Sequence, residues 1–113
     1  MNEQMKEIEI SMEQAKSIII TKNSLDKLFS NKDFKKVILD GYLKDEAVRL
    51  VLCKAHANHQ NAESQEQLNK DIDAIGRLNE YFRHVFVQGQ MAEQAIAEGS
   101  EALEELRNEV EDA

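Results

Sequence analysis

The sequence predicts an all-α protein in which a helical hairpin packs on a long C-terminal helix, and that helix continues as a coiled-coil extension. Two observations predict this fold class. The 113 residues include no proline and only four glycines, so nothing forbids long uninterrupted helices. Apolar residues in the second half alternate steps of three and four, the spacing of a coiled-coil seam. We therefore expect an N-terminal arm over 1–10, a helical core over 11–88 and an acidic coiled-coil extension over 89–113.

The first residues predict a short extended arm followed by a helix. Ile8 and Ile10 alternate with charged residues, which favours extended backbone, although a frayed helix would also accommodate them. Ser11 and Gln14 have the spacing of a capping box, so we expect the first helix to begin at Ser11. Ser30 and Asn31 offer both the end of this helix and the N-cap of the next one, which begins after Asn31. The expected apolar face of the first helix consists of Met12, Ala15, Ile18, Ile19, Leu25, Leu28 and Phe29.

The stretch FKKVILDGYLKDEAVRLV, residues 34–51, predicts a helical pair hinged at its centre. Apolar residues recur at helical spacing on both sides of Asp40 and Gly41, and Val48 and Leu52 widen the second apolar stripe. Gly41 favours a break as a left-handed residue after a short helix. The alternative is one continuous helix, in which glycine costs about 1 kcal/mol relative to alanine. The polar segment HANHQNAE then predicts a loop.

The second half predicts a single helix that begins at another capping box, Ser64 with Gln67, and runs to residue 111. A helix of about 48 residues is roughly 70 Å long, which is more than one small core can cover. Beyond Gly89 the apolar face narrows to a seam typical of self-association, and a partly frayed acidic terminus is the alternative. The expected oligomer interface, called the seam below, consists of Phe82, Val85, Gly89, Ala92, Ile96, Gly99, Leu103 and Leu106.

The net charge of −8 is placed entirely in the second half. Residues 1–63 carry ten Lys or Arg against ten Asp or Glu, whereas residues 64–113 carry four against twelve. An acidic surface repels phosphate, so we expect a basic protein surface rather than a nucleic acid as partner. The single Cys53 predicts a reducing compartment, and the lack of a run of about 18 apolar residues predicts no membrane span.

Three groups of residues have the chemical types of a site, and a structural role is favoured for each. Cys53, His56 and His59 have a metal-like spacing, but a fourth ligand is not evident, so we expect no metal. His84 has no nucleophile or acid at a suggestive spacing, which favours an interface histidine over a general base. A third group of carboxylates has Lys or Arg within three or four residues, as solvated helix faces do. These are Asp40, Asp45, Glu46, Asp71 and Asp73. The sequence thus predicts no enzyme and no cofactor.

Three stretches carry a resemblance to a known group of proteins. They are the opening ISMEQAK, the block NKDFKKVILDGYLKDEAVRLV, and the helix IDAIGRL…YFR…GQMAEQAIAE. Together they resemble small all-helical proteins of tailed bacteriophages, a group known chiefly as virion-associated products or products without an assigned role. The resemblance covers residues 10–98, and DFKKVILDGY with EAVRLV is its most specific part. Where such sequences usually have a loop with proline, this chain has HANHQNAE.

The resemblance implies a phage-made protein of the host cytoplasm, with the virion as a second location, and it supplies no catalytic residues. We expect it to act through protein–protein interaction, in virion assembly as a scaffold or chaperone or as a minor structural component. The expected partners are other copies of the chain and other virion proteins or a host protein. One alternative is an inhibitor that binds a host or defence protein through its acidic helical surface. Another is a small-molecule sponge with a pocket near Tyr81 to Phe86.

Self-association through the seam predicts an effect of charge. Ile96→Asp or Leu103→Asp is expected to lower the mass measured by light scattering, because either change places a carboxylate between apolar side chains. An unchanged monomeric mass in wild type and variants alike would reject association through the seam.

Overall fold

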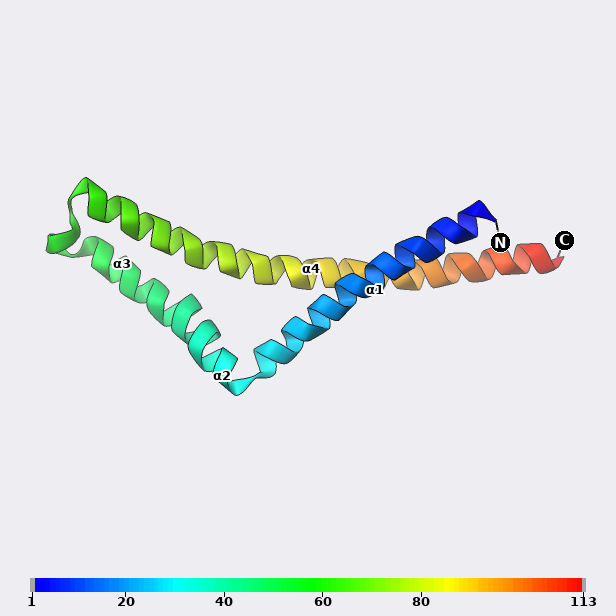
Figure 1. Cartoon of the computed structure of the whole chain (residues 1–113), viewed down its shortest axis with the longest axis horizontal. Helices are drawn as coiled ribbons and strands as arrows, with labels where there is room; N and C mark the ends of the chain where they lie inside the picture. Colours follow the sequence, from blue (N-terminus) through cyan, green and yellow to red (C-terminus); the bar gives the residue numbers. More distant parts are fainter. Residues whose placement is uncertain (1, 113) are drawn as a thin grey trace. The chain divides into compact units, whose positions relative to one another are not determined.

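The computed structural model describes residues 2–112, and in this range it contains helices and no strand (Figure 1). The predicted all-α class with a long C-terminal helix is confirmed. In chain order the elements are α1 (Glu3–Ser30), α2 (Lys32–Phe34), the π-helix η1 (Lys35–Glu46), α3 (Ala47–Ala55), the short 3₁₀ turn η2 (Ala57–His59) and α4 (Ala62–Asp112). The ribbon of α4 continues without interruption through its glycines (Figure 1).

Three of the helices begin at an asparagine. The Oδ1 atoms of Asn2, Asn31 and Asn61 each accept a hydrogen bond from the backbone N–H three residues further on, at 2.7, 2.9 and 2.8 Å. Each bond satisfies one of the N–H groups that a helix start leaves without a partner. The predicted N-cap at Asn31 is confirmed. The predicted starts at Ser11 and Ser64 are wrong, because the asparagines cap earlier turns.

The extended conformation expected for the N-terminal arm is wrong, because residues 3–10 form the first turns of α1. Met5, Ile8 and Met12 follow each other at steps of three and four, and each is half-buried. The helix leaves Ile10 59% exposed. This segment is therefore helical although Ile8 and Ile10 alternate with charged residues, because a helix places three apolar side chains on one face. The division into arm, core and extension at residues 10 and 88 stays a prediction.

The break expected at Asp40 and Gly41 is also wrong, because the backbone passes through both residues as the π-helix η1. No glycine in residues 2–112 has a positive φ, as a left-handed residue after a helix would. A step of four residues goes past a full turn in an α-helix and falls short of one in the wider π-helix, so the two kinds of turn offset each other along this stretch. The buried and half-buried side chains at this spacing are Phe34, Ile38, Tyr42, Glu46 and Leu50.

The chain forms two compact units. The first contains the described residues up to Ser24 together with those from His84 onward, and the second is Leu25–Arg83. Even Leu50, the most buried hydrophobic side chain described, remains 4% exposed, so both cores are thin. The buried hydrophobic residues are Ala15, Val85, Ala92 and Leu103 in the first unit and Leu25, Leu50 and Ile75 in the second.

In the first unit α1 and α4 run antiparallel. Lys22 contacts the surface of Gly89, and Met12 contacts that of Gly99. From Met12 to Lys22 is ten residues forward along α1, and from Gly99 to Gly89 is ten residues back along α4. The two helices therefore keep one register over this length. Both large side chains come from α1 and both glycines from α4, so the missing side chains make room for Met12 and Lys22.

In the second unit three phenylalanines join α1, α2 and α4. The ring centroids of Phe29 and Phe34 are 5.9 Å apart, and those of Phe29 and Phe82 are 5.3 Å apart with an edge-to-face geometry. Phe34 and Phe82 complete the triangle at 6.0 Å. Such pairs stabilise beyond their buried area, by about 0.5–1.5 kcal/mol each. The triangle fixes the turn at Asn31 against α4.

Two glutamine side chains hold the connection between α3 and α4. The Nε2 of Gln60 donates to the carbonyls of Lys54 and His56 at 3.1 and 2.7 Å. The Nε2 of Gln65 donates to the carbonyls of Lys54 and His59 at 2.9 and 2.6 Å. The bonds to Lys54 satisfy a carbonyl at the C-terminal end of α3, and those to His56 and His59 hold the short turn that follows. The loop is therefore tied to α4.

Two glycines of α4 predict opposite effects of substitution by alanine. A Cβ at Gly89 would lie 2.6 Å from the Cβ and Cγ of Lys22, whereas a Cβ at Gly76 would meet nothing within 4 Å. Gly89→Ala is expected to destabilise the fold by about 1–3 kcal/mol through overpacking. Gly76→Ala is expected to stabilise it by up to about 1 kcal/mol through helix propensity. Urea unfolding followed by circular dichroism measures both, and equal effects would contradict the close approach at Gly89.

Candidate interaction surface

The seam predicted as an oligomer interface lies on one face of α4. In the first unit its residues face α1 of the same chain: Gly89 and Gly99 are in contact with Lys22 and Met12. Phe82 lies in the second unit, against Phe29. The other members are buried or half-buried, namely Val85, Ala92, Ile96, Leu103 and Leu106. The structure therefore brings the predicted residues together, but their use between copies stays a prediction.

The partner of the seam within the chain was not recognised from the sequence. Residues of α1 follow the same alternation of three and four from Met5 to Lys22, and this spacing was the available signal. Lys22 obscured it, because a charged residue interrupts the apolar series. A carboxylate at Ile96 or Leu103 would disturb the pairing of α1 with α4 too, so helicity has to be measured beside mass.

Lys22 combines an apolar and a polar contact at the centre of the first unit. Its aliphatic stem lies over Gly89, and its Nζ lies 2.7 Å from Oε1 of Glu93. The side chain of Lys22 is only 18% exposed, whereas that of Glu93 is 48% exposed. The ammonium thus reaches the surface while the stem fills the seam. A lysine in a seam specifies register, since a shifted pairing would bury its charge without a partner.

The outer face of α3 is apolar and exposed to solvent. Val48, Val51 and Leu52 are 55%, 56% and 67% exposed. Together with the exposed Ala55 they occupy positions i, i+3, i+4 and i+7 of one helix face, called the outer stripe below. Leu50 lies on the other face, beside Ala74 of α4. The helix is therefore apolar on both sides, and packing within the second unit accounts for one of them.

Charged side chains surround the outer stripe. The Nε of Arg49 donates to Oε1 of Glu46 at 2.6 Å, and this carboxylate raises the pKa of the guanidinium above its ordinary value. Within residues 2–112 neither Lys44 nor Lys54 forms an ion pair. Asp45 supplies a carboxylate beside Lys44. With Arg49 and Glu46 neutralising each other, the surroundings of the stripe keep a net positive charge.

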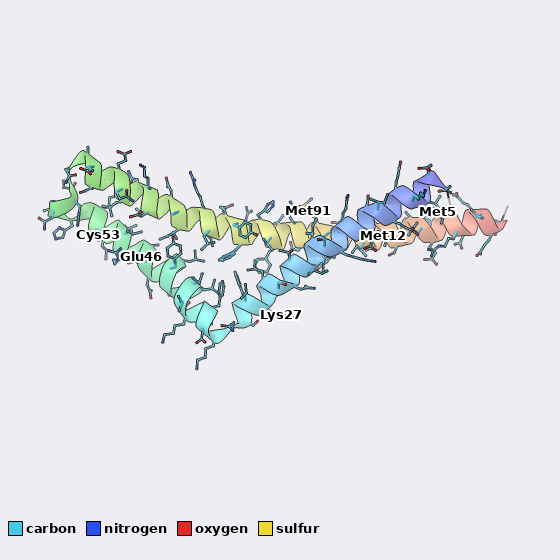
Figure 2. All side chains as sticks on the ribbon, in the orientation of Figure 1. Met5, Met12, Lys27, Glu46, Cys53 and Met91 are labelled. Atoms are coloured by element: carbon cyan, nitrogen blue, oxygen red, sulfur yellow. The ribbon has the colours of Figure 1, made fainter. Side chains whose placement is uncertain are left out.

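A recess of about 270 Å³ adjoins the outer stripe at the end of α3. Arg49, Leu52, Cys53, His56 and His59 line it, and Cys53 and Glu46 mark this part of the chain in Figure 2. The Sγ of Cys53 accepts a hydrogen bond from Nη1 of Arg49 at 3.7 Å. Among the described residues no group of three or more His, Cys, Asp or Glu is arranged to hold a metal ion. The walls of the recess are mostly apolar, so the recess continues the apolar surface of the outer stripe.

The predicted carboxylates and His84 are distributed over separate surfaces. Glu46 and Asp71 line a recess of about 250 Å³ with Tyr42, and Asp71 accepts a hydrogen bond from Gln67 at 2.9 Å. The remaining carboxylates of the predicted group are exposed and do not line this recess. His84 is exposed on α4. The structure therefore brings together two of the five carboxylates.

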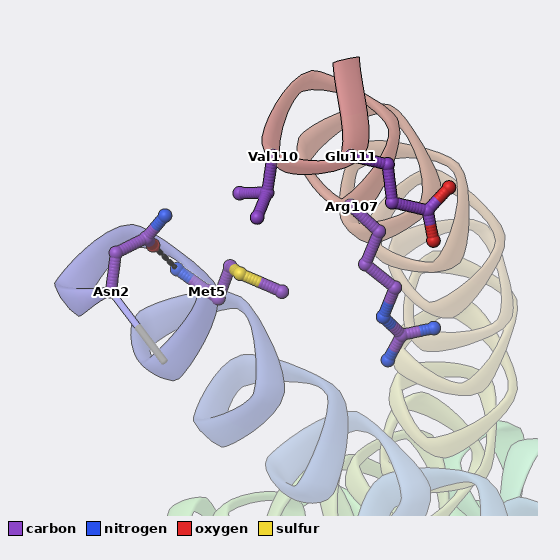
Figure 3. Close-up of a pocket in the computed structure, with 5 residues that line it drawn as sticks. All are labelled: Asn2, Met5, Arg107, Val110 and Glu111. Carbon is purple, nitrogen blue, oxygen red and sulfur yellow. Dashed lines mark hydrogen bonds between the residues drawn. The ribbon is translucent and has the colours of Figure 1, made fainter. Parts of the chain in front are cut away.

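A third recess, of about 520 Å³, lies between the start of α1 and the end of α4 (Figure 3). Met5 and Val110 extend into it from the two helices, and Arg107 and Glu111 border it. The Oδ1 of Asn2 is occupied by the N-cap bond to the backbone of Met5. This recess lies at the end of the α1–α4 pairing. Its lining combines the apolar Met5 and Val110 with the charged Arg107 and Glu111.

The comparisons with protein-family models, with curated proteins and with solved structures found no match to this chain. In residues 2–112 no helix has both the length and the apolar character that crossing a membrane requires. The function is therefore inferred from the surfaces of the chain, among which the outer stripe is the strongest candidate for a binding site.

The contact of Lys22 with Glu93 predicts a measurable coupling energy. In a double-mutant cycle with Lys22→Met and Glu93→Gln we expect about 0.5–1 kcal/mol, because Glu93 is partly exposed to solvent. The pair Lys16 and Glu13 is the control, since it lies within α1 at 3.0 Å and is more exposed. Its coupling is expected to be about 0.3 kcal/mol. Equal coupling in both cycles, measured by urea unfolding, would show that Lys22 does not fix the pairing.

Proposed function

We propose that the chain is a non-enzymatic bacteriophage protein that acts by binding other proteins, in virion assembly as a scaffold or chaperone or as a minor structural component. One observation carries the binding role: three aliphatic side chains of the outer stripe are more than half exposed on a helix whose other face is packed. Contiguous apolar patches of this kind mark interaction sites. The resemblance to small phage proteins supports the viral setting.

The outer stripe supplies enough apolar surface for a modest affinity. Burying the exposed part of Val48, Val51 and Leu52 contributes about 1 kcal/mol for each side chain at 25 cal/mol per Å². The stripe lies on a helix fixed by Leu50 and by the tied loop, so little ordering is needed on binding. A helix of a partner that lies along α3 would use steps of three and four.

The charge of the first unit favours a second candidate, a phage inhibitor that binds a host or defence protein. Residues 1–24 and 84–113 together carry four Lys or Arg against twelve Asp or Glu, whereas residues 25–83 carry ten against ten. The whole excess charge thus belongs to the first unit. A surface of one sign steers a partner of the opposite sign toward it.

A pair of variants tests the role of the outer stripe. The chain carrying Leu52→Asp and the chain carrying Ile20→Asp are each used to capture proteins from infected cells. Leu52 and Ile20 are 67% and 66% exposed, so the two changes place the same charge at equally open sites. We expect Leu52→Asp to abolish capture of the partner and Ile20→Asp to retain it.

The identity of the captured protein, determined by mass spectrometry, separates the candidates. Virion or prohead proteins support the assembly role, whereas a host enzyme supports the inhibitor. Capture that is unaffected by Leu52→Asp would reject the outer stripe as the binding surface. Absence of the chain from both virions and proheads would reject a structural role.

A further inference from the structure

We propose that the outer stripe of α3 binds the outer face of α4 in a second copy of this chain, with the two helices antiparallel. This inference rests on the proposed interaction function and names the partner of that surface. It joins two different surfaces, one from each unit, and neither of them is the seam that α1 covers.

The second surface is an apolar and acidic stripe on α4. Val87, Met91, Ala95 and Glu98 follow at steps of four, four and three, so they share one helix face, called the acidic stripe below. Val87 and Met91 are 39% and 58% exposed, and Ala95 and Glu98 are exposed as well. Met91 is labelled on α4 in Figure 2. The acidic stripe continues toward the C-terminus with Glu105 at helical spacing.

The spacings of the two stripes match when the helices are antiparallel. Going back along the chain from Ala55, the exposed positions are separated by four, three and four residues; going forward from Val87, the separations are four, four and three. Both series advance by eleven residues. Val48 to Ala55 lies in α3 and Lys44 lies three residues before that helix, in η1, so the two lengths of helix are close to equal. The alignment pairs Ala55 with Val87, Val51 with Met91, Val48 with Ala95 and Lys44 with Glu98.

Charge selects the antiparallel direction. It places Lys44 of one copy beside Glu98 of the other, and within residues 2–112 of a single chain neither side chain has an ion pair. Beyond Glu98 the acidic helix then follows η1, in which Asp40 precedes Lys44 and two lysines, Lys35 and Lys36, lie at the start. A parallel alignment would place Lys44 beside the apolar Val87 instead, where the other copy supplies no carboxylate.

Pairing α3 with α3 is the alternative contact. Two copies of the outer stripe in antiparallel contact would bring Lys44 and Asp45 of one copy to Lys54 of the other, so repulsion and attraction offset each other there. The proposed contact is heterologous, so in a pair of copies one outer stripe and one acidic stripe, on different copies, remain free. With four positions on each side, it is smaller than a standard interface of about 1,600 Å². We therefore expect weak association that depends on concentration and on salt.

Charge reversal tests the pairing of Lys44 with Glu98. Sedimentation velocity over a concentration series compares the wild type with Lys44→Glu, Glu98→Lys and the double variant carrying both changes. We expect each single reversal to weaken association about three- to tenfold, as an exposed ion pair becomes a repulsion. The double variant restores opposite charges in the contact and is expected to return to the wild-type affinity.

Two further samples complete the experiment. A mixture of the two single variants is expected to associate as the wild type does, because each contact between unlike chains then joins opposite charges. Leu52→Asp is expected to weaken association at least about tenfold by burying a carboxylate in the apolar contact. Circular dichroism checks that all variants keep their helicity, as expected for changes at exposed positions.

Several outcomes would overturn the proposal. A wild-type chain that stays monomeric up to millimolar concentration rejects it. Association whose strength is unchanged by both single reversals also rejects it; exchange of α1 between copies through the seam would give that result. A double variant that stays weak rejects the pairing of Lys44 with Glu98. If the outer stripe captures a different protein while the chain stays monomeric, this inference fails and the proposed function stands.

Discussion

The first unit depends on the position of one lysine over one glycine. The absence of a side chain at Gly89 admits the stem of Lys22, and the ammonium then reaches Glu93 at the surface. This contact allows two long helices to approach at a point where two ordinary side chains would separate them. It also opposes any other register, because a slipped lysine would lose both its hole and its counter-charge. The seam is filled by α1 for this reason.

A seam filled from within the chain leaves the outer faces of the helices for other contacts. In α3 the division is sharp: Leu50 stabilises the fold, while Val48, Val51 and Leu52 contribute little to it and remain open. A helix that is apolar on both sides lowers solubility, and the mixed charges at its edges offset this cost. Stability and interaction thus use opposite faces of the same nine residues.

The sequence predicted what regular spacing encodes. The all-α class, the long last helix and the N-cap at Asn31 follow from missing prolines, repeated steps of three and four, and a capping side chain. The sequence led to wrong predictions where one residue fitted two different structural patterns. Ile10 alternates with Ile8 as in a strand, Lys22 interrupts the apolar face of α1, and Gly41 reads as a stop although it lies inside η1. The outer stripe was predicted as a wider core, because apolar spacing shows which residues share a face and leaves open what covers it.

The π-helix η1 bears on how this chain can change in length during evolution. In an α-helix one inserted or deleted residue rotates everything beyond it by about a quarter of a turn, which would turn the inner face of a following helix partly toward solvent. A segment bonded from residue i to i+5 can absorb a deletion by relaxing locally to α-helical bonding. Residues 35–46 are therefore the part of the hairpin where a change of length least disturbs the faces of α3.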